Sequence, residues 1–252
     1  MTFVFEAGIV IAMVAVALGA QLGIKRLAGT YDFSAHNAVA GMMLSVAGIV
    51  YAVVLGFVVV VAWQAFQRAD TTAFAEVNAV GDMYRYAPTL GEPLATTVRA
   101  DLRRYIRLEI DDDWPAMERG ATDAASLEQA NRLVADFVRA PAQSNSFARS
   151  REMDLLQQLI DSRRSRIYSN AGSVGVQLWA TLIIGSILTI GMTFVFGMQN
   201  FRVHLLLTAM TTTMIGIMFV LILDLDQPFR GNASHSIHYW SNLGRTIADP
   251  AI

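Results

Sequence analysis

The sequence predicts an all-α membrane protein with four transmembrane helices, arranged as two hairpins, and a water-exposed helical domain between them. The main observation is that four stretches contain no Asp, Glu, Lys or Arg, namely residues 7–24, 37–67, 167–201 and 203–223. Each is at least ~18 residues long, the length that separates a membrane span from a buried core helix. Composition agrees: 54% of residues are hydrophobic and only 16% are charged, where a soluble domain has about 25% charged residues.

Charge is concentrated in the middle of the chain. Between Gln67 and Arg166 there are 14 of the 19 Lys and Arg residues and 16 of the 21 acids. This distribution predicts a first transmembrane hairpin, an aqueous helical domain, a second transmembrane hairpin and a C-terminal tail, over residues 1–66, 67–171, 172–226 and 227–252. Because no Lys or Arg precedes Lys25, the first run lacks the positive start of a signal peptide, and we expect a retained span.

The second span carries small residues three or four positions apart on one helical face, where a neighbouring helix can approach closely. Its opposite face is bulky. The small face either packs against another helix or lines a narrow conduit, with Phe57 or Val60 as an apolar constriction that gates by dewetting. The candidate pore-lining residues are Ser45, Gly48, Ala52, Gly56, Phe57 and Val60.

The second span is predicted to continue into the aqueous domain as one long helix. No Pro or turn cluster interrupts the chain between Ala38 and Tyr86, and Ala87-Pro88 is the expected stop. At ~1.5 Å per residue such a helix is roughly 70 Å long. Three amphipathic helices, over 94–110, 127–139 and 152–167, are predicted to cover it as a small bundle, with breaks at 111–115 and 140–146.

The exit of the fourth span carries Asp224 and Asp226, which oppose the dipole of a helix C-terminus and are therefore expected to have partners. Four crossings put both termini and the aqueous domain on one side of the membrane, so basic residues next to the third span lie at the same surface. These groups form either an interfacial ion-pair clasp or an ion-attracting ring at a pore mouth. The basic candidates are Arg163, Arg164, Arg166 and Arg230.

Within the fourth span, Thr208, Thr212 and Gly216 recur four residues apart, which favours tight helix packing over a polar pore lining. No catalytic set, nucleotide-binding loop or cofactor motif is visible. The chain has no Cys, and His235 with His238 lacks an obvious third ligand, so we expect no enzyme, cofactor or metal site. Mid-membrane positions without acids or bases argue against a proton-coupled transporter.

Several passages resemble the bestrophin-like family of bacterial and plant membrane proteins. They are residues 76–85, 103–115, 162–166 and, most specifically, 223–231 (Leu-Asp-Leu-Asp-Gln-Pro-Phe-Arg-Gly). The resemblance implies four spans, a helical aqueous domain and an oligomer, five-fold in true bestrophins, that encloses an anion pore lined by the second span. The chain lacks an acidic calcium clasp like that of animal bestrophins.

These observations lead us to expect a homo-oligomeric, anion-permeable ion channel whose second span lines the axis, with the lipid bilayer, further copies of the chain and small anions as partners and no nucleic acid. The alternative is a non-conducting membrane scaffold or signalling subunit that presents its long helix and bundle to a partner. We expect a bacterial inner-membrane location with the domain and both termini cytoplasmic, because Arg residues crowd the domain side. The first span alone, followed by Lys25 and Arg26, argues the reverse.

Overall fold

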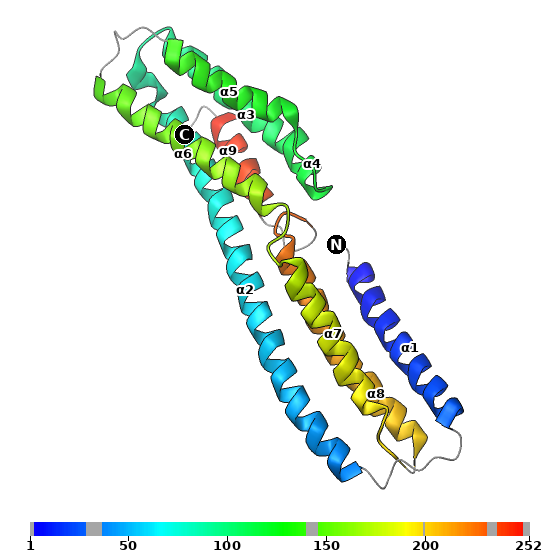
Figure 1. Ribbon diagram of the computed structural model, residues 1–252. Helices are drawn as coiled ribbons and strands as arrows, with labels where there is room; N and C mark the ends of the chain where they lie inside the picture. The colour runs from blue at the N-terminus through cyan, green and yellow to red at the C-terminus, as the bar shows by residue number, and fades with distance from the viewer. Residues whose placement is uncertain (1–2, 29–36, 140–145, 199, 231–235, 249–252) are drawn as a thin grey trace. The chain divides into compact units, whose positions relative to one another are not determined.

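The described part of the chain in the computed structural model is all-α, as predicted, and contains no strand (Figure 1). It comprises every residue except 1–2, 29–36, 140–145, 199, 231–235 and 249–252. The chain divides into two compact units. Unit 1 contains residues 1–64 and 173–226, and unit 2 contains residues 65–172 and 227–252.

Unit 1 holds the helices that are long and apolar enough to cross a membrane: α1 (Phe3–Ala28), the first part of α2 (Asn37–Tyr86), α7 (Val176–Thr193) and α8 (Phe201–Asp226). The prediction of four spans is therefore confirmed. The connection expected over 29–36 lies outside the described residues. Between α7 and α8 the turn is short, which makes this pair an antiparallel hairpin (Figure 1).

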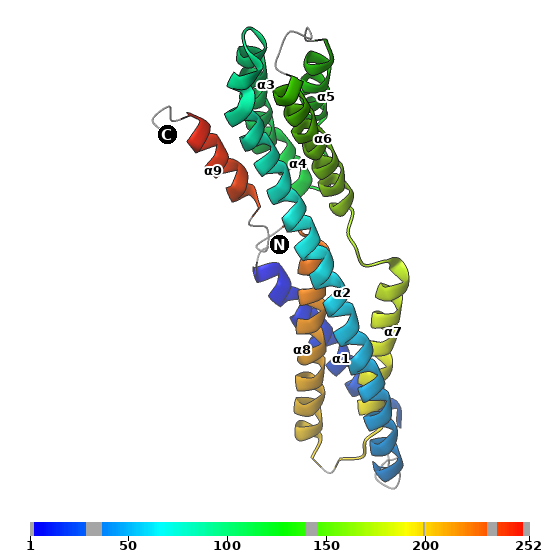
Figure 2. The same cartoon turned by 90° about the vertical axis from the view of Figure 1, so that its left-hand side faces the viewer.

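Helices α1 and α8 lie side by side, as both ribbon views show (Figures 1 and 2). A Cβ placed on Gly216 of α8 would lie 3.4 Å from Val10 and 3.6 Å from Met13 of α1. Thr208 and Thr212 are buried at 0% and 1% exposure on the same face. The small and hydroxyl-bearing stripe of the fourth span therefore serves helix packing, the favoured of its two interpretations.

Helix α2 confirms the prediction of one continuous helix from the second span into the aqueous domain. It ends at Tyr86, followed by a 3₁₀ turn over Ala87–Leu90 that contains Pro88. Proline restricts the residue before it away from helical geometry, which explains why the α-helix stops there. At ~1.5 Å per residue, the 50 residues span about 75 Å.

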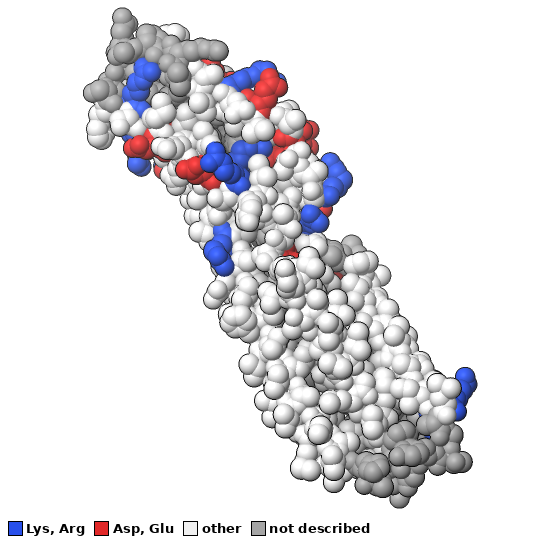
Figure 3. Space-filling model, in the orientation of Figure 1, with Lys and Arg blue, Asp and Glu red and all other residues white. Residues whose placement is uncertain are grey.

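Unit 2 joins the second part of α2 to four further helices: α3 (Leu94–Leu108), α5 (Ala124–Arg139), α6 (Ser146–Ser169) and α9 (Ile237–Ala248). Their apolar faces meet in one core with α5 against α3 and α6, and spacings of three and four residues predicted all of these helices except α9. Charged side chains gather on the visible face over these helices, whereas the visible face of unit 1 is almost free of them (Figure 3). Core residues at or below 2% exposure include Val80, Met83, Leu102, Leu133, Leu159 and Trp240.

Two details of unit 2 correct the prediction. The chain does not leave the helix at 111–115, because a π-helical turn over Glu109–Asp113 leads into a short helix α4 (Trp114–Glu118). The wider π turn points residues four apart in nearly the same direction, so Glu109 and Asp113 both reach the core, at 0% exposure. The C-terminal tail expected over 227–252 contains a helix, α9, whose Trp240 is 0% exposed in the core of unit 2. The break predicted at 140–146 falls mostly outside the described residues.

Candidate functional site

The candidate pore-lining residues lie on the part of α2 that the rest of unit 1 leaves largely uncovered. Phe57 and Val60 are 65% and 51% exposed. A Cβ on Gly48 or on Gly56 would have no described atom within 4 Å, so no helix of the same chain approaches the small stripe. Ser45 bonds only back to its own helix, at Gly41 O (2.8 Å).

A few residues tie α2 to the rest of unit 1. The Tyr51 hydroxyl donates to the Leu182 carbonyl of α7 at 3.2 Å, and the Tyr51 ring fills the space over Gly185. At the start of the helix, the Asn37 amide exchanges two hydrogen bonds with the Gly197 backbone, at 2.8 and 2.9 Å. The Tyr51 side of α2 thus packs inside the chain, beside the small stripe and away from Phe57. Asn37, about three turns before Gly48, lies on nearly the same side as that stripe.

Helical spacing separates the candidates into two faces. Gly48 and Phe57 are nine residues apart, which is two and a half turns, so they point in opposite directions. Ser45, Ala52 and Gly56 lie near the Gly48 side. Starting from Phe57, steps of four and three residues lead along one face of α2 through Val61, Gln64, Arg68, Thr71 and Ala75.

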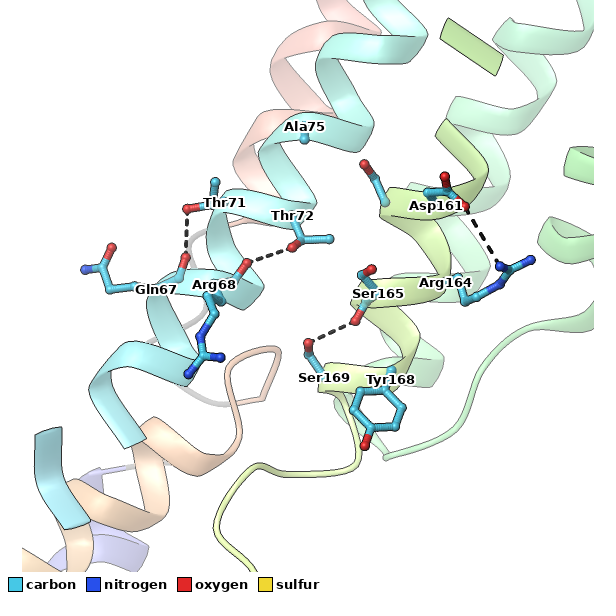
Figure 4. Close-up of a pocket in the computed structure, with 11 residues that line it drawn as sticks. Gln67, Arg68, Thr71, Thr72, Ala75, Asp161, Arg164, Ser165, Tyr168 and Ser169 are labelled. Atoms are coloured by element: carbon cyan, nitrogen blue, oxygen red, sulfur yellow. Dashed lines mark hydrogen bonds and ion pairs between the residues drawn. The ribbon is translucent and has the colours of Figure 1, made fainter. Parts of the chain in front are cut away.

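In unit 2 this face of α2 borders an open groove of ≈840 Å³, whose other wall is α6 (Figure 4). Hydroxyl, amide and guanidinium groups dominate its lining, and Asp161 is the one acid. The Arg164 guanidinium lies 3.8 Å from the Asp161 carboxylate, and both side chains are largely exposed. The lining residues are Gln67, Arg68, Thr71, Thr72, Ala75, Asp161, Ser162, Arg164, Ser165, Tyr168 and Ser169.

Three of the six hydroxyl groups that line the groove already donate hydrogen bonds to their own helices. Thr71 and Thr72 donate to the carbonyls of Gln67 and Arg68 at 2.8 Å, and Ser169 donates to Ser165 O at 2.9 Å, as Figure 4 shows. The guanidinium groups therefore carry the electrostatic preference of the groove. Two Arg against one Asp give the lining a net positive charge.

Two of the four arginines expected at the membrane surface, Arg163 and Arg166, lie in the core of unit 2. Arg166 is 0% exposed, and its guanidinium contacts Glu76 at 2.6 Å, Glu109 at 2.6 Å and Asp113 at 3.1 Å. Arg163, at 3% exposure, pairs with Glu109 and with Asp113 (3.2 Å). Buried charges persist only when they are paired and hydrogen-bonded, and this cluster joins α2, the π turn and α6.

This ion cluster also contains Tyr105, which donates to Glu76 at 2.7 Å and accepts from Arg163 at 3.2 Å. Three carboxylates face two guanidiniums, so the fully ionised cluster has a net charge of −1. Burial raises the pKa of Glu109 to about 7, against the opposing pull of Arg166. Sequence reasoning missed the three acids, although their positions on the apolar side of amphipathic helices were a usable signal.

Asp224 and Asp226, at the exit of the fourth span, were expected to pair with arginines, but their surroundings are different. The Asp226 carboxylate accepts hydrogen bonds from the backbone N–H groups of Ser173 and Val174, both at 2.6 Å, and from Trp179 Nε1 at 3.4 Å. These donors precede or begin α7, where a negative charge also suits the helix dipole. Asp226 at the end of α8 is thus linked to the start of α7 by backbone N–H donors, where an Arg partner was expected. Asp224 is half-buried and accepts no hydrogen bond from the described residues.

Arg230 belongs to unit 2, where its Nη2 lies 3.4 Å from the Asn170 carbonyl and its guanidinium covers Gly120. A Cβ at Gly120 would overlap that guanidinium, and the φ of 79° there also favours glycine. Nearby, Phe229 packs edge-on against Trp114 at 5.7 Å between ring centroids. The passage after the fourth span therefore anchors the bundle. His235 lies outside the described residues.

Comparison with known proteins adds the family. A model of the Bestrophin-like domain matches residues 11–236. A search of the curated proteins finds no match. Among solved structures the chain resembles a bacterial bestrophin homologue from Klebsiella pneumoniae at 13% identity, covering 98% of each chain with a TM-score of 0.69. Two variants of that homologue are also similar, each covering 98% of this chain and 97% of the variant's chain. One variant is 12% identical with a TM-score of 0.68, and the other is 14% identical with a TM-score of 0.66.

Identities this low show a shared fold, and the family model covers most of the chain, including the fourth-span exit on which the resemblance chiefly rested. The four apolar helices agree with an embedded protein. The chain therefore belongs to the Bestrophin-like family and is an integral membrane protein.

Proposed function

We propose that the chain assembles as a homo-oligomer and forms an ion channel whose pore is lined by α2. The observation that carries the proposal is that α2 is exposed in unit 1 and continues into unit 2: Val46, Val53 and Phe57 are between 65% and 67% exposed. Helices α1, α7 and α8 also expose apolar residues, such as Val16 at 72% and Met214 at 68%, but they lie wholly within unit 1. A long helix that its own chain leaves open on two sides is suited to contact with further copies and with an axial pore.

The Phe57 face is the better candidate for the pore. Its apolar residues provide a constriction, and its continuation along α2 carries Gln64, Arg68 and Thr71, which an ion leaving the membrane can contact. The opposite small stripe, with Gly48 and Gly56, is suited to close packing between copies, because small residues let helix backbones approach.

Anion preference is supported by charge. The membrane part of α2 offers no carboxylate to a cation, and the groove beside its continuation carries Arg68 and Arg164 against Asp161. The family resemblance adds a five-fold assembly as the expected subunit number. We place the channel in a bacterial inner membrane, with unit 2 and both termini on the cytoplasmic side, because surface arginines such as Arg68 and Arg164 flank the spans there.

Purified protein in planar bilayers tests the conduction claim. We expect unitary currents that reverse near the anion equilibrium potential. Phe57→Ala widens the constriction and raises the unitary conductance, whereas Val59→Ala, two residues away on the other side of the helix, leaves it nearly unchanged. Silence at high protein density contradicts the channel and favours the non-conducting scaffold.

Selectivity and assembly have separate readouts. Arg68→Glu shifts the reversal potential towards the cation value, while Arg85→Glu, at an exposed site bonded to Asp82 at 2.9 Å, does not. Particle mass in detergent reports the subunit number, and a reporter fused after Ile252 reports the side of the membrane. A monomeric mass contradicts the pore formed between copies.

A further inference from the structure

Unit 1 contains a crevice of ≈400 Å³ between α1 and α7, with α8 behind it. Its walls are made of small or apolar side chains, among them Ala17 and Ala20 of α1 and Ile190 of α7. Gly191 also lines it, and a Cβ there would meet no described atom within 4 Å. The volume lies in the range of sites that hold small molecules.

The crevice also contains a buried hydroxyl without a partner. Thr212 of α8 is 1% exposed, and its Oγ1 makes no hydrogen bond with any described residue. Helical threonines usually bond back to the carbonyl four residues earlier. Thr211 does so to Leu207 O at 3.0 Å, and Thr181 does so to Gln177 O at 2.9 Å. Hydrocarbon supplies no water to satisfy Thr212, so its donor is available to a ligand.

A second hydroxyl in the same crevice offers the complementary group. Ser186 of α7 is 5% exposed, and its hydroxyl donates to Ile183 O at 2.8 Å. Its hydrogen is used, and the Tyr51 hydroxyl also lies beside it, but a hydroxyl oxygen has two lone pairs and retains the capacity to accept. The crevice therefore presents one free donor, from Thr212, and one acceptor, from Ser186, within an apolar surface.

We propose that this crevice binds a lipophilic alcohol. The alkyl body lies against Ala17, Ala20 and Ile190, and the ligand hydroxyl accepts a hydrogen bond from Thr212 and donates one to Ser186. A ketone satisfies only the Thr212 donor, and an alkane satisfies neither group. The alcohol is therefore the ligand class that matches both polar groups.

Photolabelling of the full chain in lipid nanodiscs, with a diazirine derivative of octanol, tests this site. We expect labelled residues on the facing sides of α1 and α7 and competition by octanol but not by octane. Thr212→Val keeps the shape and removes the hydroxyl, and it should weaken labelling about tenfold, the effect of one lost hydrogen bond. Thr212→Ser should retain labelling. Thr211→Val, whose hydroxyl bonds its own helix, is the matched control.

A second variant keeps the test decisive if Thr212→Val folds poorly. Gly191→Leu fills empty space, so it should abolish labelling without lowering the thermal unfolding temperature. Equal labelling of Thr212→Val and the natural chain overturns the proposal. Competition by octane as effective as by octanol also overturns it, because the crevice then holds hydrocarbon such as lipid chains. Labelling spread evenly over the lipid-facing helices shows that no site exists.

Discussion

The two parts of α2 differ in what covers them, although they form one helix. In unit 2, Ala73, Val80 and Met83 are 0% exposed beneath the bundle. In unit 1, Val46 and Phe57 of the same helix are about two-thirds exposed. Lipid covers apolar surface as well as protein does, so a span need not bury its apolar residues within its own chain. In the aqueous part the apolar residues have to be buried within the chain, because exposing apolar surface to water is unfavourable.

The contrast extends to charge. Unit 2 buries Arg163 and Arg166 together with three carboxylates, whereas the membrane part of α2 has no charged side chain. A buried charge can be balanced by specific partners in a folded bundle, but a lipid-exposed helix face has no such partners. Changes in the covered part of α2 and its cluster should therefore act on stability, and changes in the open part should act on assembly.

The largest effect is expected at Arg166. Arg166→Met leaves three fully buried carboxylates without their shared cation, which costs about 3–5 kcal/mol and should lower the unfolding temperature of unit 2 strongly. Thermal unfolding of the full chain in detergent measures the loss. Arg164→Met, at an exposed pair 3.8 Å apart, should cost under about 1 kcal/mol. Similar losses in the two variants would mean that the buried cluster does not stabilise the bundle.

The open part of α2 is tested by Gly48→Leu. Since no described atom lies within 4 Å of a Cβ there, the chain itself should fold normally. Added bulk between copies should nevertheless shift the particle mass in detergent towards the monomer, far more than Val46→Leu does on the bulky face. Equal tolerance of both substitutions would show that the small stripe faces lipid.

The pH dependence sharpens the contrast between the units. Burial raises the pKa of Glu109 from 4.5 to about 7, and that of Glu152, also in unit 2, to about 8. A raised folded-state pKa means that the folded protein holds the proton more tightly, so this stabilisation is complete below pH 4.5 and is lost as pH rises through 7 and 8. We expect unfolding temperature to fall from pH 5 to 8.

For Glu109 the loss should be on the order of 1–3 kcal/mol, and Glu109→Gln should make the fall in stability below pH 7 less steep, leaving the part that Glu152 contributes. Glu128→Gln, at an exposed residue paired with Arg132, is the matched control. The remaining slope above pH 7 should disappear in Glu152→Gln. An unfolding temperature that rises with pH, or a slope that stays unchanged in both variants, would contradict the assignment of the pH dependence to Glu109 and Glu152.

The smallest effect is expected in unit 1, at Asp226. Asp226→Asn keeps an oxygen that can accept from Ser173 or Val174 but removes the charge beside the start of α7, at a cost of about 0.5–2 kcal/mol. Asp224→Asn, which removes no hydrogen bond, is the control. Because Asp226 and Arg163 bond to different groups, their losses should add within about 0.5 kcal/mol. If the losses at Asp226 and Arg163 are strongly non-additive, the ion-pair clasp expected from the sequence would be the better interpretation.

Much of the fold could be predicted because the relevant signals are local. Charge-free runs located all four spans, and the absence of Pro before Pro88 gave the length of α2. The ion cluster could not be predicted in the same way. Two of its acids, at residues 109 and 113, are neighbours on one turn, but they lie far along the chain from residue 76 and from the Arg run at 163–166. That run also read equally well as a membrane-surface cluster. Likewise, Trp240 gave no local sign that α9 would join the core.

The sequence by itself determined where the chain is apolar enough to enter a membrane and where its longest helix ends, since both depend on neighbouring residues and on the solvent. Only the tertiary structure decided which charges are buried. Arg163 and Arg166 fall within the core because α6 turns that side towards Glu76 and the π turn, whereas Arg164 faces outward. A buried charge is tolerated only where distant segments bring compensating groups within hydrogen-bonding distance, and that condition is met by packing rather than by local sequence.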